Sequence, residues 1–308
     1  MSIAIVFPGQ GAQKVGMAKD FYDNSEVSRK IFDVADENLD FNIKDICFEE
    51  NEDINITEYT QAAMLTACVA MYEEVKRQGL TADVYAGLSL GEYTALVASE
   101  VISFSDAVKA VRKRGILMQQ AVPVGVGAMA AVLGLENKTV GDVCDEIDGV
   151  VVANYNCPGQ VVISGIEEAI KKAGEKLCDA GAKRVIYLNV SGPFHSFMLE
   201  DAGNKLESYL ENFEMKAPVV PYVTNVTAQY ITDNSEIRSL LGKQVYSSVK
   251  WQQSVEEMIA AGVDTFIEIG PGRTLTGFIK KINKDVKSYN IQKYEDVETV
   301  VKAVKGEQ

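Results

Sequence analysis

The chain has 308 residues, of which 47% are hydrophobic and 24% charged, values typical of a globular enzyme with one large domain or two smaller ones. Its formal net charge of -14 argues against nucleic acid as a partner, because binding to phosphates requires a basic surface. No apolar run approaches the roughly 20 residues of a membrane span, and the N-terminus lacks a signal-peptide pattern, so we expect a cytoplasmic protein with no membrane partner.

The first part of the chain predicts a strand followed by helices. Residues 2–7 form a β-rich run that ends in a Pro-Gly-Gln-Gly turn, which neither a strand nor a helix can continue. Residues 17–50 are predicted to be helical and mixed in character. The helix of residues 57–78 is crowded with apolar side chains, so it should be largely buried, and Gly79 suits its C-terminal end.

The strongest chemical signal is the stretch Gly87-Leu88-Ser89-Leu90-Gly91, which lies between an apolar strand and a helix-forming segment. A serine on so sharp a strand-to-helix turn needs glycine two positions to either side, since a Cβ there would not fit. The turn would leave the hydroxyl of Ser89 at the end of a sheet, with the backbone N–H of Leu90 pointing at a developing oxyanion. The pattern also arises by chance, but its context indicates a nucleophile elbow for acyl transfer.

A helix is predicted from a capping box at residues 103–106 to about residue 120. It contains Arg112, Lys113 and Arg114, which point in different directions because successive helical residues turn by about 100°. Only some of the three can face one cleft. Arg114 either belongs to a solvated helix face or forks onto the free carboxylate of an acyl group, which lysine cannot do equally well.

Residues 124–190 follow a glycine-rich hinge and show a rhythm of their own. The predicted elements are a strand at 129–133, a helix at 139–147, strands at 150–154 and 160–164, a helix at 167–180 and a strand at 184–188. This βαββαβ order is that of a ferredoxin-like domain. We therefore predict a small domain at 124–190, inserted into a larger domain that is formed by residues 1–123 and 191–308.

The last part of the chain returns to alternating strands and helices. The predicted elements are a helix at 198–213, a strand at 219–225, helices at 235–246 and 255–261, a strand at 265–269, a helix at 275–281, a strand at 286–291 and a helix at 296–304. Such alternation predicts an α/β fold with a mainly parallel sheet and helices on both of its faces.

His195 is the only histidine of the chain and lies in a Gly-Pro loop directly after the inserted domain. It is the candidate partner of Ser89, which has no other side chain able to take its proton near neutral pH. The two residues are far apart in the sequence, so folding has to bring them together. No Asp or Glu stands out as the third member of a triad. We therefore predict a Ser-His dyad whose imidazole is oriented by a backbone carbonyl or a side-chain amide.

Several motifs together resemble those of the malonyl-CoA:acyl carrier protein transacylases of fatty acid synthesis, in order along nearly the whole chain. They are Pro8-Gly9-Gln10-Gly11, Thr60-Gln61, Gly87-Leu88-Ser89-Leu90-Gly91-Glu92-Tyr93, Arg112-Lys113-Arg114-Gly115, Asn154-Tyr155-Asn156-Cys157-Pro158-Gly159-Gln160-Val161-Val162-Ile163-Ser164-Gly165, Gly192-Pro193-Phe194-His195-Ser196 and Glu268-Ile269-Gly270-Pro271-Gly272. The resemblance implies that the larger domain is α/β-hydrolase-like and carries the ferredoxin-like insertion.

The resemblance also implies an activity and its residues. A malonyl group would pass from malonyl-CoA to Ser89 and then to the phosphopantetheine thiol of acyl carrier protein, without a cofactor. His195 would be the base and acid, oriented by the backbone carbonyl of Gln244, and Arg114 would hold the carboxylate. Gln10 and the N–H of Leu90 would shape the oxyanion hole. The other residues that the resemblance places at the substrate site are Gln61, Asn154, Asn156 and Phe194.

The sequence departs from the family at Leu88, where the family usually has histidine, so no role of that imidazole is carried over. Three alternatives stay open: a free-standing acyltransferase of a polyketide synthase, a serine hydrolase of thioesters or lipids, and a non-enzymatic docking subunit. Arg114 favours transfer of a carboxylated acyl group over the hydrolase. Intact Ser89 and His195 oppose the docking subunit.

Overall fold

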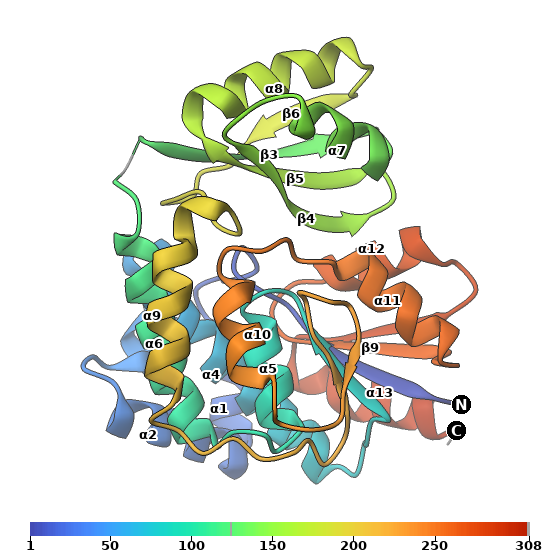
Figure 1. Cartoon of the computed structure of the whole chain (residues 1–308). Helices are drawn as coiled ribbons and strands as arrows, with labels where there is room; N and C mark the ends of the chain where they lie inside the picture. Colours follow the sequence, from blue (N-terminus) through green and yellow to red (C-terminus); the bar gives the residue numbers. More distant parts are fainter. Residues whose placement is uncertain (124, 307–308) are drawn as a thin grey trace.

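The computed structural model describes residues 1–123 and 125–306, and its strands form two separate sheets (Figure 1). The strand order in the larger sheet is β10-β9-β1-β2-β7-β8. Its strands are β1 (Ile3–Phe7), β2 (Val84–Gly87), β7 (Tyr222–Val223), β8 (Tyr230–Ile231), β9 (Thr265–Ile269) and β10 (Lys287–Ile291). Neighbouring strands are parallel except β7 and β8, which run antiparallel. The prediction of a mainly parallel sheet is confirmed, with an unpredicted antiparallel strand at one edge.

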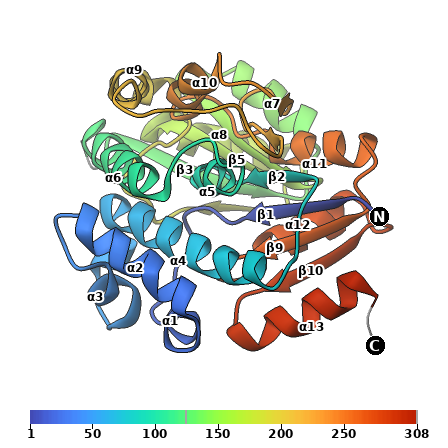
Figure 2. The ribbon, with the colours of Figure 1, turned by 90° about the horizontal axis from the view of Figure 1, so that it is seen from below.

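Helices cover both faces of the larger sheet. They are α1 (Lys19–Asn24), α2 (Glu26–Asn38), α3 (Ile43–Phe48), α4 (Thr57–Arg77), α5 (Gly91–Ala98), α6 (Phe104–Gln120), α9 (Glu200–Leu210), α10 (Ile237–Gln244), α11 (Trp251–Ala260), α12 (Thr274–Ile282) and α13 (Tyr294–Lys305), with 3₁₀ turns at Asp53–Asn55 and Phe197–Leu199. Ile5 and Phe7 belong to a core shared with α4 and α13, whereas Ala4 and Val6 belong to a second core with α11 and α12. Alternate side chains of β1 thus feed opposite cores, and Figure 2 shows α4 and α13 on one side of the strands and α11 on the other.

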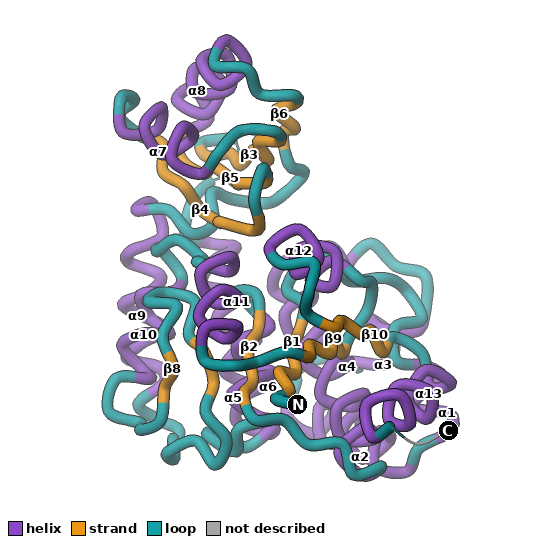
Figure 3. The backbone as a smooth tube through the Cα atoms, turned by 90° about the vertical axis from the view of Figure 1, so that its right-hand side faces the viewer, coloured by secondary structure: helices purple, strands orange, loops and turns teal. Residues whose placement is uncertain are grey.

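The smaller sheet has four strands in the order β4-β5-β3-β6, and all of its neighbouring strands are antiparallel. Its elements are β3 (Gly127–Leu133), α7 (Asn137–Asp145), β4 (Val150–Cys157), β5 (Gln160–Ile166), α8 (Glu167–Asp179) and β6 (Arg184–Tyr187). The predicted βαββαβ order is therefore confirmed. A third core lies between this sheet and its two helices, which Figure 3 shows on the far side from the larger sheet.

The smaller sheet is joined at β4 to a loop of the rest of the chain by backbone hydrogen bonds. The N–H of Val249 donates to the carbonyl of Ala153 over 2.8 Å, and the N–H of Tyr155 donates to the carbonyl of Val249 over 2.9 Å. These bonds hold the middle of β4 against the loop before α11. The residues that follow on β4 are thereby placed near the carboxyl ends of the strands of the larger sheet.

Most predicted elements differ from the structure by a few residues at their ends, and two of the differences have a clear physical reason. The strand expected at 219–225 is reduced to Tyr222–Val223, because Pro221 has no N–H to donate and the chain turns back after Thr224, whose N–H donates to the carbonyl of Gln229. The helix expected from residue 255 begins at Trp251, whose side chain is fully buried in the second core. Packing of one large side chain extends this helix by a full turn.

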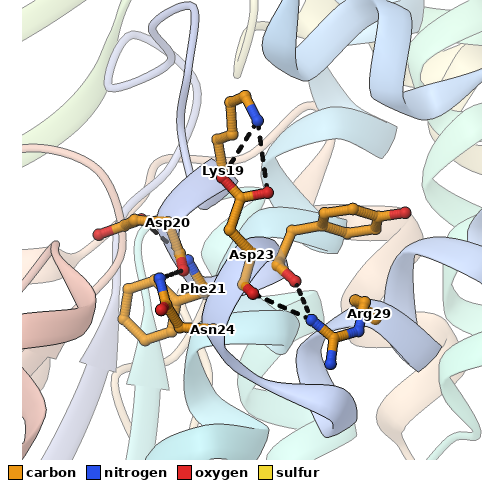
Figure 4. A network of polar contacts seen from close by, with 7 residues as sticks. Lys19, Asp20, Phe21, Asp23, Asn24 and Arg29 are labelled. Atoms are coloured by element: carbon orange, nitrogen blue, oxygen red, sulfur yellow. Dashed lines mark hydrogen bonds and ion pairs between the residues drawn. The ribbon is translucent and has the colours of Figure 1, made fainter.

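A polar network holds the corner between α1 and α2 (Figure 4). Arg29 donates to the carbonyls of Tyr22 and Asp23 over 2.9 and 3.1 Å, which satisfies carbonyl groups at the C-terminal end of α1. The carboxylate of Asp20 is the second polar group of this corner. It accepts the N–H of Phe21 through Oδ1 and the N–H of Tyr294 through Oδ2. Since Tyr294 begins α13, this corner ties the first helix to the last one.

None of the helices in the described part of the chain has the length and hydrophobicity that a membrane span requires.

Candidate active site

A cavity of about 640 Å³ lies between the two sheets, at the carboxyl ends of β1 and β2. The larger sheet lines it with residues that directly follow these strands, Gln10 after β1 and Ser89 after β2. The smaller sheet contributes Asn154 and Asn156 from β4. Ligands of open parallel sheets bind at this edge, so the cavity is the candidate substrate site.

The turn between β2 and α5 is a strained one. Ser89 has a φ of 51°, in the left-handed region that residues with a Cβ rarely adopt. A Cβ on Gly87 would overlap with the backbone of Gly91, and a Cβ on Gly91 would overlap with the carbonyl oxygen of Phe7 in β1. Both glycines therefore allow the close approach that the elbow requires, as the sequence pattern predicted.

We expect Gly91→Ala to lower the free energy of unfolding by about 2 to 4 kcal/mol, because the carbonyl of Phe7 belongs to a central strand and cannot move aside freely. Urea unfolding measures this change. Gly277→Ala in α12 is the matched control: nothing lies within 4 Å of the added methyl group. That substitution should stabilise the helix by up to about 1 kcal/mol. Equal stability of the two variants would contradict the steric account of the elbow.

Ser89 and His195 meet across the cavity. The Oγ of Ser89 lies 2.8 Å from Nε2 of His195, and Nδ1 of His195 lies 2.8 Å from the backbone carbonyl oxygen of Gln244. A carbonyl can only accept, so Nδ1 carries the proton and Nε2 is free to accept from the serine hydroxyl. The structure therefore places an imidazole in the tautomer that a general base needs.

His195 is almost completely buried, with 5% of its surface exposed. Burial, followed by the nearby positive charge of Arg114, lowers the pKa of His195 to about 4. Its backbone N–H donates to the carbonyl of Val245 over 3.1 Å, which holds the loop against the end of α10. The imidazole is thus neutral at neutral pH and able to take a proton.

Arg114 is the one residue of its basic triplet that reaches the cavity. It donates through Nη1 to Oε1 of Gln61 over 2.8 Å, and through Nη2 to Oε1 of Gln244 over 2.9 Å and to Oγ of Ser89 over 3.2 Å. Only 1% of its surface is exposed, and burial lowers its pKa. All three acceptors are neutral oxygens, and among the described residues its Nε has no partner. Within the part of the chain that the structure describes, the site thus holds a buried cation without a contacting carboxylate.

The other two basic residues of α6 face elsewhere. The guanidinium of Arg112 lies over the rings of Phe41 and Tyr59, at 5.0 and 4.9 Å from their centres, and its Nε is 3.0 Å from a carboxylate oxygen of Asp40. Lys113 lies over the ring of Tyr209. The prediction that only part of the triplet can face one cleft agrees with these positions.

The remaining predicted residues occupy different places around the cavity. Gln10, Leu90, Asn154, Asn156 and Phe194 line it, and the buried Oδ1 of Asn156 has no hydrogen-bond partner among the described residues. Nε2 of Gln10 donates to the hydroxyl of Thr57 over 3.1 Å, and that hydroxyl lies 3.0 Å from Oγ of Ser191. Gln61 does not line the cavity but stands behind Arg114, fully buried. Leu88 lines the cavity as well and packs against the second core.

The sequence did not single out Asn225 and Glu92 as site residues. Oδ1 of Asn225 accepts the N–H of Ser89 over 2.6 Å, and Oε2 of Glu92 accepts from Nε2 of Gln244 over 2.6 Å. Burial raises the pKa of Glu92 to about 7. Two signals could have indicated them: Asn225 follows β7 at its carboxyl end, and Glu92 is an ionisable residue in an otherwise apolar helix. In the described part of the chain, no cluster of three His, Cys, Asp or Glu side chains could hold a metal ion.

Comparisons with known proteins point in one direction. The model of the acyl transferase domain family matches residues 4–305. The malonyl CoA-acyl carrier protein transacylase of Bacillus subtilis (strain 168) is 44% identical over 310 residues, which cover 99% of this chain and 98% of that protein. The crystal structure of a malonyl CoA-acyl carrier protein transacylase from Clostridium perfringens has a TM-score of 0.96 and 41% identity, covering 99% of this chain and 98% of that one.

A further solved structure is a malonyl-transacylase in complex with a type II PKS acyl-carrier protein, which has a TM-score of 0.95 and 38% identity and covers 98% of this chain and 100% of that one. All three relatives match nearly the whole length of the chain, and the two solved structures share its fold. The chain therefore belongs to the acyl transferase family, among the malonyl CoA-acyl carrier protein transacylases.

Proposed function

We propose that this protein transfers a malonyl group from malonyl-CoA to the phosphopantetheine thiol of acyl carrier protein through a malonyl ester on Ser89. One observation carries the proposal. A serine oxygen lies 2.8 Å from a neutral imidazole nitrogen and 3.2 Å from a buried guanidinium that contacts no carboxylate of the described residues. The first contact suits nucleophilic attack, and the second suits an acyl group that ends in a carboxylate.

Each half-reaction moves one proton through His195. Oγ of Ser89 attacks the thioester carbon while Nε2 of His195 takes the hydroxyl proton, and the tetrahedral intermediate then expels the CoA sulfur, which receives that proton. In the second half, the carrier thiol gives its proton to His195 and attacks the ester carbon, and Ser89 leaves as a hydroxyl. The carbonyl of Gln244 orients the imidazole in both halves. Bonds and protons balance without a metal or a cofactor, so malonyl-CoA and the carrier thiol are the only reactants that the scheme requires.

The developing oxyanion is assigned to the N–H of Leu90 and the side chain of Gln10. Leu90 directly precedes α5, so its N–H belongs to the positive end of a helix. Gln10 lines the cavity from the loop after β1 and can turn its amide from Thr57 toward the substrate. Asn154, Asn156 and Phe194 would surround the acyl chain, and Gln61 would hold the guanidinium of Arg114.

The proposal also includes a finer description of the two domains and the location of the protein in the cell. The larger domain, residues 1–123 and 191–308, is described as α/β-hydrolase-like, and the small domain, residues 124–190, as ferredoxin-like. The strand order β4-β5-β3-β6 and the βαββαβ succession support the second description. Residue 124 and residues 307–308 lie outside the described residues, so these bounds depend on the sequence there. A cytoplasmic location is proposed with them.

Mass spectrometry of the intact protein mixed with malonyl-CoA tests the proposed reaction. We expect a malonyl adduct on the wild-type protein and none on Ser89→Ala. Ser208→Ala, which removes an exposed hydroxyl on α9, should retain the adduct. Addition of carrier protein bearing phosphopantetheine should then clear the adduct and yield malonyl carrier protein. An adduct that persists on Ser89→Ala would refute the assigned nucleophile.

A polyketide carrier is the second candidate acceptor. The similarity to a malonyl-transacylase bound to a type II PKS acyl-carrier protein supports it. Competition between a fatty acid carrier and a polyketide carrier for the malonyl enzyme separates the two acceptors by their relative kcat/KM. If free malonate is released as fast without any carrier as with it, the protein is a hydrolase and the proposed transfer is wrong.

A further inference from the structure

The carboxyl group of Glu92 is buried behind the elbow and is not used by the chemistry described above. None of its surface is exposed. Its Oε2 accepts two hydrogen bonds, from Nε2 of Gln244 over 2.6 Å and from the backbone N–H of Asn225 over 3.1 Å. Both partners are N–H groups, so Oε2 acts as an acceptor whether the carboxyl group is charged or neutral.

The NH₂ group and the oxygen of the Gln244 side-chain amide face opposite kinds of hydrogen-bonding partner. Nε2 faces two acceptors, Oε2 of Glu92 and the carbonyl oxygen of Ser89, the latter at 3.1 Å. Oε1 faces the guanidinium of Arg114, which can only donate. An amide turned by 180° would set its NH₂ group against a cation and its oxygen against a carboxyl oxygen. Glu92 therefore favours the one orientation of Gln244 that supports Arg114.

The guanidinium depends on this support because it has so few fixed contacts. Its Nη1 is held by Gln61 and its Nη2 by Gln244 and Ser89, while its Nε is unpaired among the described residues. The ring of Tyr93, whose centre lies 5.6 Å from Cζ of Arg114, adds a cation–π contact that does not fix the orientation of the guanidinium. Loss of the Gln244 oxygen would leave Nη2 bound to the nucleophile alone.

We propose that Glu92 is a positioning residue that determines selectivity for carboxylated acyl groups, acting through the amide of Gln244 to aim Arg114 at the acyl carboxylate. This inference rests on the proposed function, since it requires that Arg114 binds that carboxylate. It assigns Glu92 no contact with the substrate. An acyl group without a carboxylate, such as acetyl, should therefore be largely indifferent to Glu92.

Asn225 provides the contrast, because it holds the nucleophile and not the clamp. Its Oδ1 accepts the N–H of Ser89 over 2.6 Å, and its Nδ2 donates to the carbonyl of Gly87 over 2.7 Å. The side-chain amide thus continues the pairing of β2 with β7 beyond the end of β7 and holds Ser89 in its strained conformation. Loss of this side chain should affect every acyl group alike.

The test compares acylation of Ser89 by malonyl-CoA and by acetyl-CoA, measured as rates of adduct formation, with labelling by an uncharged fluorophosphonate as a probe of the serine alone. Glu92→Met should lower the malonyl-to-acetyl ratio by about 10- to 100-fold, the range expected when a charge-assisted hydrogen bond is misdirected. Fluorophosphonate labelling should stay within about threefold of the wild type, because Glu92 contacts neither Oγ of Ser89 nor the ring of His195 and the hydrogen bond between those two groups remains. Glu92→Gln keeps an acceptor oxygen and should retain the ratio.

Three further variants keep the inference falsifiable. Gln244→Leu removes the amide but not the backbone carbonyl that His195 uses, and it should reproduce the loss of ratio even if Glu92→Met folds poorly. Asn225→Ala should lower malonyl, acetyl and fluorophosphonate rates together. Glu74→Met removes another fully buried, hydrogen-bonded carboxyl group, remote from the cavity, and should change stability but not the ratio.

The inference is overturned if Glu92→Met and Gln244→Leu lower all three rates equally, or if they leave the malonyl-to-acetyl ratio at its wild-type value. It is distinct from a failure of the proposed function, which would appear as the absence of a malonyl adduct on the wild-type protein.

Discussion

Replacement of His195 with alanine should lower kcat/KM for malonyl transfer by at least about 10³-fold, because no other side chain in the described part of the chain contacts Oγ of Ser89 as a base. Among residues 1–123 and 125–306, the only other side chain within hydrogen-bond distance of that oxygen is Arg114, which donates and cannot take a proton. A coupled assay of CoA release at several malonyl-CoA concentrations measures the change. The loss should fall on kcat, since His195 contributes little to holding the bound thioester.

His195→Gln preserves most of the side-chain volume and should be as inactive as the alanine variant, which separates loss of the base from loss of packing. The control is Phe197→Ala, which truncates a side chain that is 46% exposed two residues downstream and should stay within about twofold of the wild type. If either His195 variant kept more than a tenth of the wild-type kcat, the dyad would be wrong.

The protonation of His195 can be followed directly because it is the only histidine of the chain. Nitrogen NMR of the imidazole should show a proton on Nδ1 at pH 7 and titration near pH 4, since burial lowers the pKa to about 4. The folded pKa lies below that of the unfolded chain, so His195 favours folding above about pH 6.5 and this contribution is lost as the pH falls toward 4. Titration near 6.5 would show an imidazole open to water.

The features that could be predicted from sequence are those with a local signal. The elbow is specified by two glycines that lie within one stretch of five residues, at positions where a Cβ would not fit. The alternation of strands and helices follows from short apolar runs and the residues that interrupt them. His195 was identifiable because the chain contains no second histidine. Arg114 could be placed in a helix, but the direction in which its side chain points depends on how α6 packs against its neighbours. Arg112, two residues earlier, points elsewhere and binds Asp40.

Features that depend on distant segments left little trace in the sequence. Asn225 binds Ser89 only because β7 pairs with β2 and ends two residues earlier, and the predicted strand of residues 219–225 would have made Asn225 an ordinary ladder residue. Glu92 meets Gln244 only after α5 and α10 come together. Gln, Asn and Glu are common residues whose role depends on the partner they face, and no local pattern names that partner.

Replacement of Arg114 with methionine should lower malonyl transfer by about 10²- to 10⁴-fold, because two charge-assisted hydrogen bonds of about 1.5 to 3 kcal/mol each would be lost. Acetyl transfer should fall far less, so selectivity for malonyl should largely disappear. Arg114→Lys keeps the charge but not the fork and should lie between the two. The rates of Ser89 acylation by malonyl-CoA and acetyl-CoA measure this change.

Arg112→Met is the matched control, since it removes a guanidinium two residues away on the same helix, which lies over two aromatic rings and outside the cavity. It should affect stability and leave the malonyl-to-acetyl ratio unchanged. Equal losses for both acyl groups in Arg114→Met would mean that this residue supports the site without binding the carboxylate.

Combining Arg114→Met with Glu92→Met tests whether the two residues act as one unit. If Glu92 acts only by aiming Arg114 through Gln244, then once the guanidinium is absent the second substitution has nothing left to misdirect. The double variant should therefore select malonyl over acetyl as weakly as Arg114→Met alone. Additive losses would instead give Glu92 an independent effect on the acyl group, by a route other than the amide that connects it to the clamp.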